Sequence, residues 1–113
     1  MADLKLLHPQ LVPVAKYLYS VGKYYDPLLV VTSGFRSEAK QARLYQKWLS
    51  GESKIPAAPP GRSLHGYGLA FDLARIGKNP FTDPLLAWLG QVWTSWGGRY
   101  GGPRDPVHFQ VRM

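Results

Sequence analysis

The chain has 113 residues, no cysteine and a formal net charge of +7. Its length and its 45% hydrophobic content predict one domain over residues 1–113, with a single small core. Without cysteine, disulfides and thiolate chemistry are excluded, so histidine and carboxylate side chains would have to hold any metal. The basic residues are scattered and no apolar run approaches the ~20 residues of a membrane span. We therefore expect neither a nucleic-acid partner nor membrane insertion.

Apolar spacing in the first half of the chain predicts a helix, a strand and a second helix. Apolar residues at three- and four-residue intervals predict a helix over residues 9–24, with Pro9 in its first turn. The β-branched run at residues 28–33 predicts a buried strand. Ser37 is expected to cap the next helix, which would end at Gly51. The apolar side of that helix would consist of Ala42, Tyr45, Trp48 and Leu49.

The second half begins with a Pro- and Gly-rich loop at residues 51–64, followed by a strand at 69–74. Asp83 is expected to cap a third helix, and residues 107–111 predict the last strand. The apolar stripe of the third helix would consist of Leu85, Leu89, Val92 and Trp96. The alternation of helix and strand would also suit a parallel sheet, but the loop-rich connections around the second strand favour an α+β fold.

Two of the three histidines lie in settings that suit a metal. His65 precedes a strand, His108 lies on the polar face of the last strand, and Asp72 stands between two alanines on its own strand. Singly, each residue would more often have a structural role. Together they form a zinc-type ligand set that leaves the fourth tetrahedral position for water. His8 precedes a helix, has no evident partner and is assigned to the surface or a helix cap.

Two further residues could take part in chemistry at such a site. Asp105 lies three residues before His108, and Pro106 favours an extended backbone at Asp105. The Asp105 carboxylate could take a proton from water and pass it to a leaving amine, or it could be a turn residue; the spacing does not decide. Arg36 could bind a substrate carboxylate or stabilise an oxyanion, or it could be a surface arginine.

Three motifs in order resemble a known superfamily. Residues 63–72 match the form S-x-H-x-x-G-x-A-x-D, and residues 105–109 match D-x-x-H-F. Residues 33–41 are similar to S-G-Y-R-S-x-x-x-Q, with Phe35 in place of the usual tyrosine. Together the motifs resemble zinc D-Ala-D-Ala carboxypeptidases and L-alanyl-D-glutamate endopeptidases, which share the fold of the Hedgehog signalling domain. The resemblance covers about residues 28–111 and implies a small antiparallel sheet flanked by helices.

The resemblance also implies roles for single residues. The Zn²⁺ ligands would be His65, Asp72 and His108. Asp105 would be the catalytic base, and Arg36 and Ser63 would contact substrate or the developing charge. Gln41 would contact substrate or support the Arg36 segment.

The sequence is most similar to the compact phage endolysins of this superfamily. Relatives acting on D-Ala-D-Ala often carry glutamate at the position of Asp105, so the resemblance implies cleavage of the L-Ala-D-Glu bond of bacterial peptidoglycan. A D-Ala-D-Ala carboxypeptidase or dipeptidase is the alternative, followed by a non-catalytic zinc-binding module. We expect a monomer. Residues 1–5 do not begin a secretory signal, so we also expect synthesis in a host cytoplasm and release through a factor such as a holin.

Overall fold

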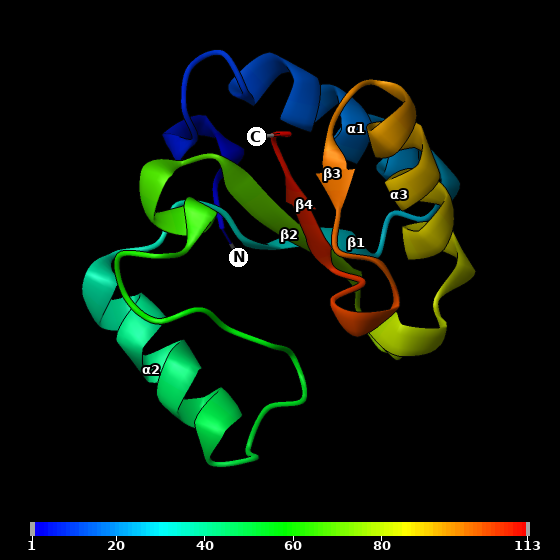
Figure 1. Cartoon of the computed structure of the whole chain (residues 1–113). Helices are drawn as coiled ribbons and strands as arrows, with labels where there is room; N and C mark the ends of the chain where they lie inside the picture. Colours follow the sequence, from blue (N-terminus) through cyan, green and yellow to red (C-terminus); the bar gives the residue numbers. More distant parts are fainter. Residues whose placement is uncertain (1, 113) are drawn as a thin grey trace.

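The computed structural model describes residues 2–112, which form three helices and one sheet of four strands (Figure 1). The helices are α1 (Val12–Tyr25), α2 (Glu38–Leu49) and α3 (Pro84–Ser95). The strands are β1 (Leu29–Ser33), β2 (Ala70–Arg75), β3 (Arg99–Tyr100) and β4 (His108–Gln110). The architecture confirms the predicted α+β class. None of the helices described is long and apolar enough to cross a membrane.

The sheet has the order β1-β2-β4-β3, and every neighbouring pair of strands is antiparallel. The register of β2 and β4 places Asp72 opposite His108 and Phe71 opposite Phe109. Because side chains alternate along a strand, the two phenylalanines share one face of the sheet and the two polar residues share the other. This pairing separates the core from the site.

The core lies between one face of the sheet and the helices α1 and α3 (Figure 1). The Phe71 and Phe109 rings stack with centroids 5.5 Å apart. The Trp93 and Phe71 rings pack edge to face, with centroids 5.3 Å apart. Nε1 of Trp93 donates to the carbonyl of Gln110 at 2.8 Å, which fastens α3 to β4. The aromatic contacts therefore hold rigid the two strands that carry Asp72 and His108.

Several predicted helix features are wrong. The first helix begins at Val12 with Pro13 in its first turn, so Pro9 lies outside it. On α3, Trp96 is 41% exposed and the buried stripe is rotated from the predicted one. That buried stripe consists of Leu86, Leu89, Gly90 and Trp93. On α2, Trp48 and Leu49 are exposed because this helix extends away from the main body (Figure 1).

Asp83 joins α3 to the sheet. Its carboxylate accepts a hydrogen bond from the backbone N–H of Leu85 at 2.9 Å, which confirms the predicted cap. Arg75 of β2 donates to the same carboxylate and also to Asp26. Burial would raise the pKa of Asp83, but the hydrogen bonds from Arg75 and Leu85 outweigh it and hold the pKa below its ordinary value of 3.8.

We expect Asp83→Ala to lower the free energy of unfolding by about 3 kcal/mol, because the change removes both a cap and one of the two carboxylate partners of the half-buried Arg75. Since the pKa of Asp83 is lower in the folded chain, its contribution is full above the unfolded pKa and is lost as the pH falls through the folded pKa. Denaturant titrations at about pH 7 and about pH 3 should therefore show a smaller gap between wild type and variant in acid. Glu52→Ala, at an exposed loop position, is the control, and an equal loss there would contradict the assignment.

Candidate metal centre and active site

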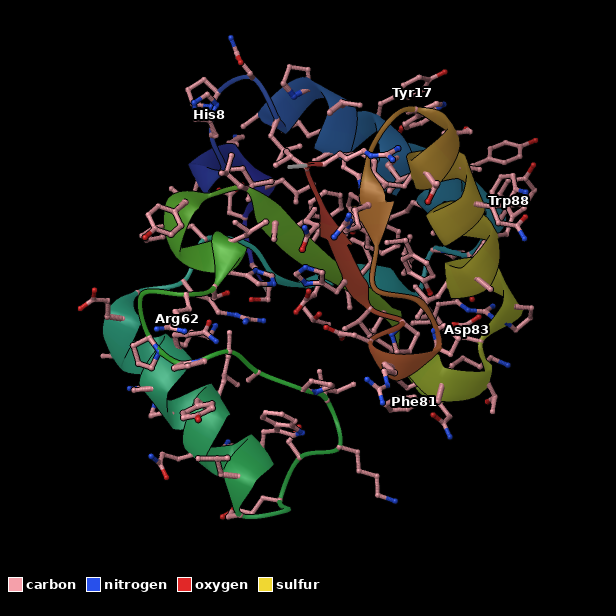
Figure 2. All side chains as sticks on the ribbon, in the orientation of Figure 1. His8, Tyr17, Arg62, Phe81, Asp83 and Trp88 are labelled. Carbon is pink, nitrogen blue, oxygen red and sulfur yellow. The ribbon has the colours of Figure 1, made fainter. Side chains whose placement is uncertain are left out.

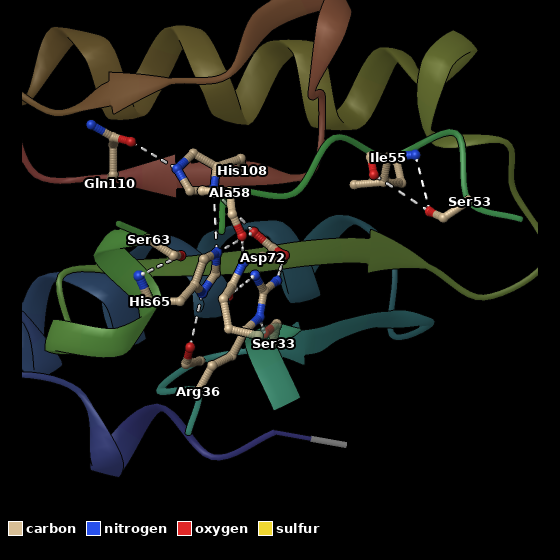
Figure 3. Close-up of polar contacts among 12 residues, drawn as sticks. Ser33, Arg36, Ser53, Ile55, Ala58, Ser63, His65, Asp72, His108 and Gln110 are labelled. Atoms are coloured by element: carbon tan, nitrogen blue, oxygen red, sulfur yellow. Dashed lines mark hydrogen bonds and ion pairs between the residues drawn. The ribbon is translucent and has the colours of Figure 1, made fainter. Parts of the chain in front are cut away.

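Three side chains from separate elements converge on the polar face of the sheet (Figure 3). His65 lies in a short 3-10 helix (Leu64–Tyr67), while Asp72 and His108 are register partners on β2 and β4. Nε2 of His65 lies 3.1 Å from Oδ1 of Asp72 and 3.2 Å from Nδ1 of His108. That Nδ1 lies 3.3 Å from the same Asp72 oxygen. The structure thus brings together the three residues predicted as ligands, while His8 lies exposed outside the cluster (Figure 2).

The outer nitrogen of each imidazole is engaged by an oxygen that can only accept. Nδ1 of His65 lies 2.8 Å from the carbonyl of Gly34, and Nε2 of His108 lies 2.8 Å from Oε1 of Gln110. A neutral imidazole carries one proton, so these contacts place it on the outer nitrogen and leave a lone pair on the inner one. Two lone pairs and a carboxylate then face one another, which is an arrangement that a bound cation stabilises.

The spacing of these atoms suits zinc. Atoms bound about 2.0–2.1 Å from a tetrahedral zinc ion lie ~3.3 Å apart, close to the spacing found here, and two imidazoles with one carboxylate are a common catalytic set. Burial lowers the pKa of His108, but the hydrogen bond and charge of Asp72 outweigh it and raise the pKa above its ordinary value. A proton would therefore compete with the metal for this imidazole.

Arg36 fixes the carboxylate of Asp72 from the side opposite the histidines. Its Nη2 donates to Oδ2 of Asp72 at 2.7 Å, its Nε to Ser33 at 2.7 Å and its Nη1 to Gln41 at 3.1 Å. A bulge in β1 before Ser33 shifts its pairing with β2, next to this contact. Burial would raise the pKa of Asp72, but the imidazoles of His108 and His65, which donate to this carboxylate when they are protonated, and the Arg36 charge hold it well below its ordinary value. Asp72 is therefore ionised and oriented before any metal binds.

Two other predicted site residues have support roles in the structure. Gln41 is buried, accepts from Arg36 and donates to the carbonyl of Ala58 at 2.7 Å, so it ties α2 to the loop above the site. The hydroxyl of Ser63 accepts from the backbone N–H of His65 at 3.2 Å and caps the 3-10 helix. Substrate contact by Gln41 and Ser63 remains a prediction.

Asp105 lies beside the ligand cluster without touching it by a side-chain hydrogen bond. Its Oδ1 is buried and has no hydrogen-bond partner among residues 2–112. Burial raises the pKa of Asp105 to about 6; His108 lowers this pKa and Asp72 raises it. An unpaired buried carboxylate oxygen carries a desolvation cost that only a ligand or a water molecule can relieve.

A cavity of about 370 Å³ brings these groups together. It is lined by His65, Asp72, His108, Asp105, Arg36 and Ser63, and by the loop of residues 55–58. The cavity can therefore admit a ligand that reaches the three inner acceptor atoms and Asp105 at once.

Comparison with known proteins identifies the family. Residues 5–96 match VanY, the D-alanyl-D-alanine carboxypeptidase family. The chain belongs to the VanY family. The matched segment includes Arg36, His65 and Asp72, and the fold then supplies His108 and Asp105 from the region beyond it.

Solved structures share the fold of this VanY-family chain. The vancomycin-resistance D,D-dipeptidase VanXYg, with a D-Ala-D-Ala phosphinate analogue bound, is 20% identical with a TM-score of 0.70 over 93% of this chain. The D,D-pentapeptidase VanY E175A mutant with Zn(II) is 19% identical, with a TM-score of 0.69 over 93% of this chain and 72% of its own. The L-Ala D-Glu endopeptidase ChiX of Serratia marcescens is 24% identical, with a TM-score of 0.60 over 97% of this chain and 84% of its own.

The chain is shorter than some of these neighbours, since it spans 50% of the length of VanXYg. At these identities the solved structures show the common fold and no more. Among curated proteins, none matches the chain.

Two residues that support the site of this VanY-family chain were not predicted from the sequence. Gln110 holds the outer nitrogen of His108, and its place two residues further along the same strand face was the available signal. Gly101 lies where a Cβ would come within 2.1 Å of the backbone oxygen of Asp105, so only glycine lets this loop close around Asp105. No pattern in the sequence indicated that contact.

We expect Gln110→Ala to weaken zinc binding by the VanY-family chain about 10- to 100-fold. The change removes the hydrogen bond that fixes the orientation of the His108 ring and keeps its proton on Nε2. Competition with a chromogenic chelator measures the affinity. Gln91→Ala, at an exposed glutamine of α3, is the matched control and should leave the affinity unchanged. Equal affinities for the Gln110 variant and wild type would show that the contact in Figure 3 does not orient the ligand.

Proposed function

We propose that this chain is a zinc-dependent peptidase that hydrolyses the peptide stems of bacterial peptidoglycan. The observation that carries the proposal is the convergence of His65, Asp72 and His108 on one cavity that also contains Asp105. A module that only binds zinc needs the three ligands but needs no unpaired carboxylate beside them. Membership of a carboxypeptidase family and a fold shared with a zinc-containing VanY support the same conclusion.

Each side chain has a defined part in such a hydrolysis. His65, Asp72 and His108 would hold the zinc ion, which when bound would supply polarisation of the scissile carbonyl and a lower pKa for a water molecule. Asp105 takes the proton of the attacking water and delivers it to the leaving amine, and a carboxyl pKa of about 6 suits both transfers near neutral pH. Arg36 uses three of its N–H groups to hold Ser33, Gln41 and Asp72. Its two remaining N–H groups can face the developing oxyanion.

The family match favours the D-Ala-D-Ala bond as the one cleaved, since the matched family is described by that activity. Cleavage there would make the chain a carboxypeptidase or dipeptidase. This order differs from the expectation drawn from motif resemblance, in which L-Ala-D-Glu came first.

The L-Ala-D-Glu bond remains the second candidate. The chain shares its fold with the endopeptidase ChiX over 97% of its residues, with a TM-score of 0.60. Aspartate at position 105, where relatives acting on D-Ala-D-Ala often have glutamate, points the same way.

Product analysis separates the two bonds. Purified peptidoglycan and defined muropeptides are digested with the zinc-loaded protein, with the chelated protein and with the chelated protein after zinc is restored, and the products are identified by mass spectrometry. Free D-alanine indicates cleavage of the D-Ala-D-Ala bond, and loss of the peptide after L-alanine indicates the endopeptidase. Unchanged muropeptides with the zinc-loaded protein would refute both.

A further inference from the structure

The cavity beside the metal centre contains two arginines in opposite situations. Arg36 has a side chain only 10% exposed and is bound to Asp72, Ser33 and Gln41. Arg62 also lines the cavity but is exposed, and its guanidinium forms no hydrogen bond or ion pair within residues 2–112. The guanidinium of Arg36 is thus neutralised by partners within the protein, whereas the guanidinium of Arg62 is available to a ligand.

The segment that carries Arg62 is held in place next to the ligands. The backbone N–H of Arg62 donates to Pro59 at 3.1 Å, and Tyr67 donates to the carbonyl of Gly61 at 3.2 Å. Ser63, the next residue, caps the helix that contains His65. The backbone of Arg62, which is labelled in Figure 2, is therefore fixed three residues before His65.

The rest of the cavity wall leaves few places for a negative charge. The loop side is apolar, consisting of Ile55, Pro56, Ala57 and Ala58. The opposite side carries the unpaired carboxylate of Asp105, which repels an anion, while the carboxylate of Asp72 is paired with Arg36. Arg62 is the cation of this wall that no protein carboxylate neutralises, and a guanidinium binds a carboxylate in a two-pronged geometry.

We propose that Arg62 binds a free carboxylate of the peptide substrate beside the scissile bond. The proposal rests on the function proposed above and names the group that the site recognises. For the D-Ala-D-Ala bond this is the C-terminal carboxylate, and for the L-Ala-D-Glu bond it is the α-carboxylate of the γ-linked glutamate. The apolar loop opposite then faces small side chains such as the methyl group of alanine.

The test uses three pentapeptide stems ending in D-Ala-D-Ala: one with both carboxylates free, one with the C-terminal carboxylate amidated and one with the glutamate α-carboxylate amidated. Each is assayed with wild type, Arg62→Ala, Arg62→Lys and the control Arg99→Ala, an exposed arginine of β3 outside the cavity. We expect Arg62→Ala to lower kcat/KM about 10-fold on the free peptide, chiefly through KM. Arg62→Lys should keep part of the effect, because lysine retains the charge without the planar fork.

The amidated peptides decide which carboxylate is bound. On the stem that lacks that carboxylate, wild type and Arg62→Ala should have similar kcat/KM, whereas the other amide should behave as the free peptide does. An equal loss on all three peptides, or no loss on any, would overturn the proposal.

Calorimetry with the zinc-loaded Asp105→Asn variant keeps the recognition step separate from hydrolysis. We expect this variant to bind the free peptide about 10-fold more tightly than the matching amide, and Arg62→Ala in the same background to remove the difference. If wild type cleaves none of the peptides, the proposed function fails. The calorimetric affinities for the acid and the amide then test the role of Arg62 alone. Equal affinity for acid and amide then refutes its role.

Discussion

Replacing Asp105 with alanine is expected to lower kcat about 100- to 10,000-fold while the zinc content stays unchanged. The predicted metal ligands are His65, Asp72 and His108, and the side chain of Asp105 hydrogen-bonds to none of them. Its removal should therefore leave the ion in place and take away the group that moves the proton. Metal analysis after dialysis, together with single-turnover rates on muropeptides, measures the two effects on one sample.

Asp105→Asn sharpens this experiment because it keeps the size and polarity of the side chain and removes only its capacity to accept a proton. Glu52→Gln, in the exposed loop, is the matched carboxylate control and should hydrolyse as wild type does. If Asp105→Asn retained full activity, Asp105 would be a loop residue, and the proton would have to move by another route.

Replacing His65 or His108 with alanine is expected to remove both zinc and activity. Each imidazole directs a lone pair at the shared point, and each loss leaves two of the three inner atoms. The affinity should fall by more than the 10- to 100-fold expected when only a supporting hydrogen bond is removed. His8→Ala is the matched control, since this exposed third histidine lies outside the cluster and should leave metal binding and hydrolysis intact.

Chelation should reproduce the phenotype of the ligand variants in wild type, and added zinc should restore activity only where all three ligands remain. Circular dichroism of each variant shows whether the fold survives. Zinc bound with wild-type affinity by a folded His65→Ala protein would contradict the assigned centre.

The candidate ligand set of His65, Asp72 and His108 could be predicted from the sequence because it depends on strand alternation and motif spacing, both of which are local. Asp72 between two alanines and His108 between two core residues each pointed to a polar strand face. The antiparallel register that places them opposite each other could not be predicted, because it is set by the packing of Phe71 against Phe109. The resemblance implied an antiparallel sheet, which the structure confirms, but not this register.

Features that depend on distant contacts were harder to predict. The ion pair of Arg36 with Asp72 joins residues 36 positions apart and could not be predicted from local spacing. The sequence therefore suggested a substrate contact for an arginine whose guanidinium mainly binds groups within the protein. The strand β3 has two residues and carries no periodicity to detect. Trp48 on α2 suited a core position by its spacing, but it is exposed, because no element within residues 2–112 packs over it closely enough to bury it.

The register of β2 and β4 links metal loading to correct folding. A slip of one residue would turn Asp72 toward the aromatic core and Phe71 toward solvent, so a misaligned chain would lose its core and its metal site together. Zinc would then select the native alignment and stabilise it by mass action, in proportion to the logarithm of the free ion concentration over Kd. Free zinc during refolding would thereby increase the fraction of chains that have the native pairing of β2 with β4.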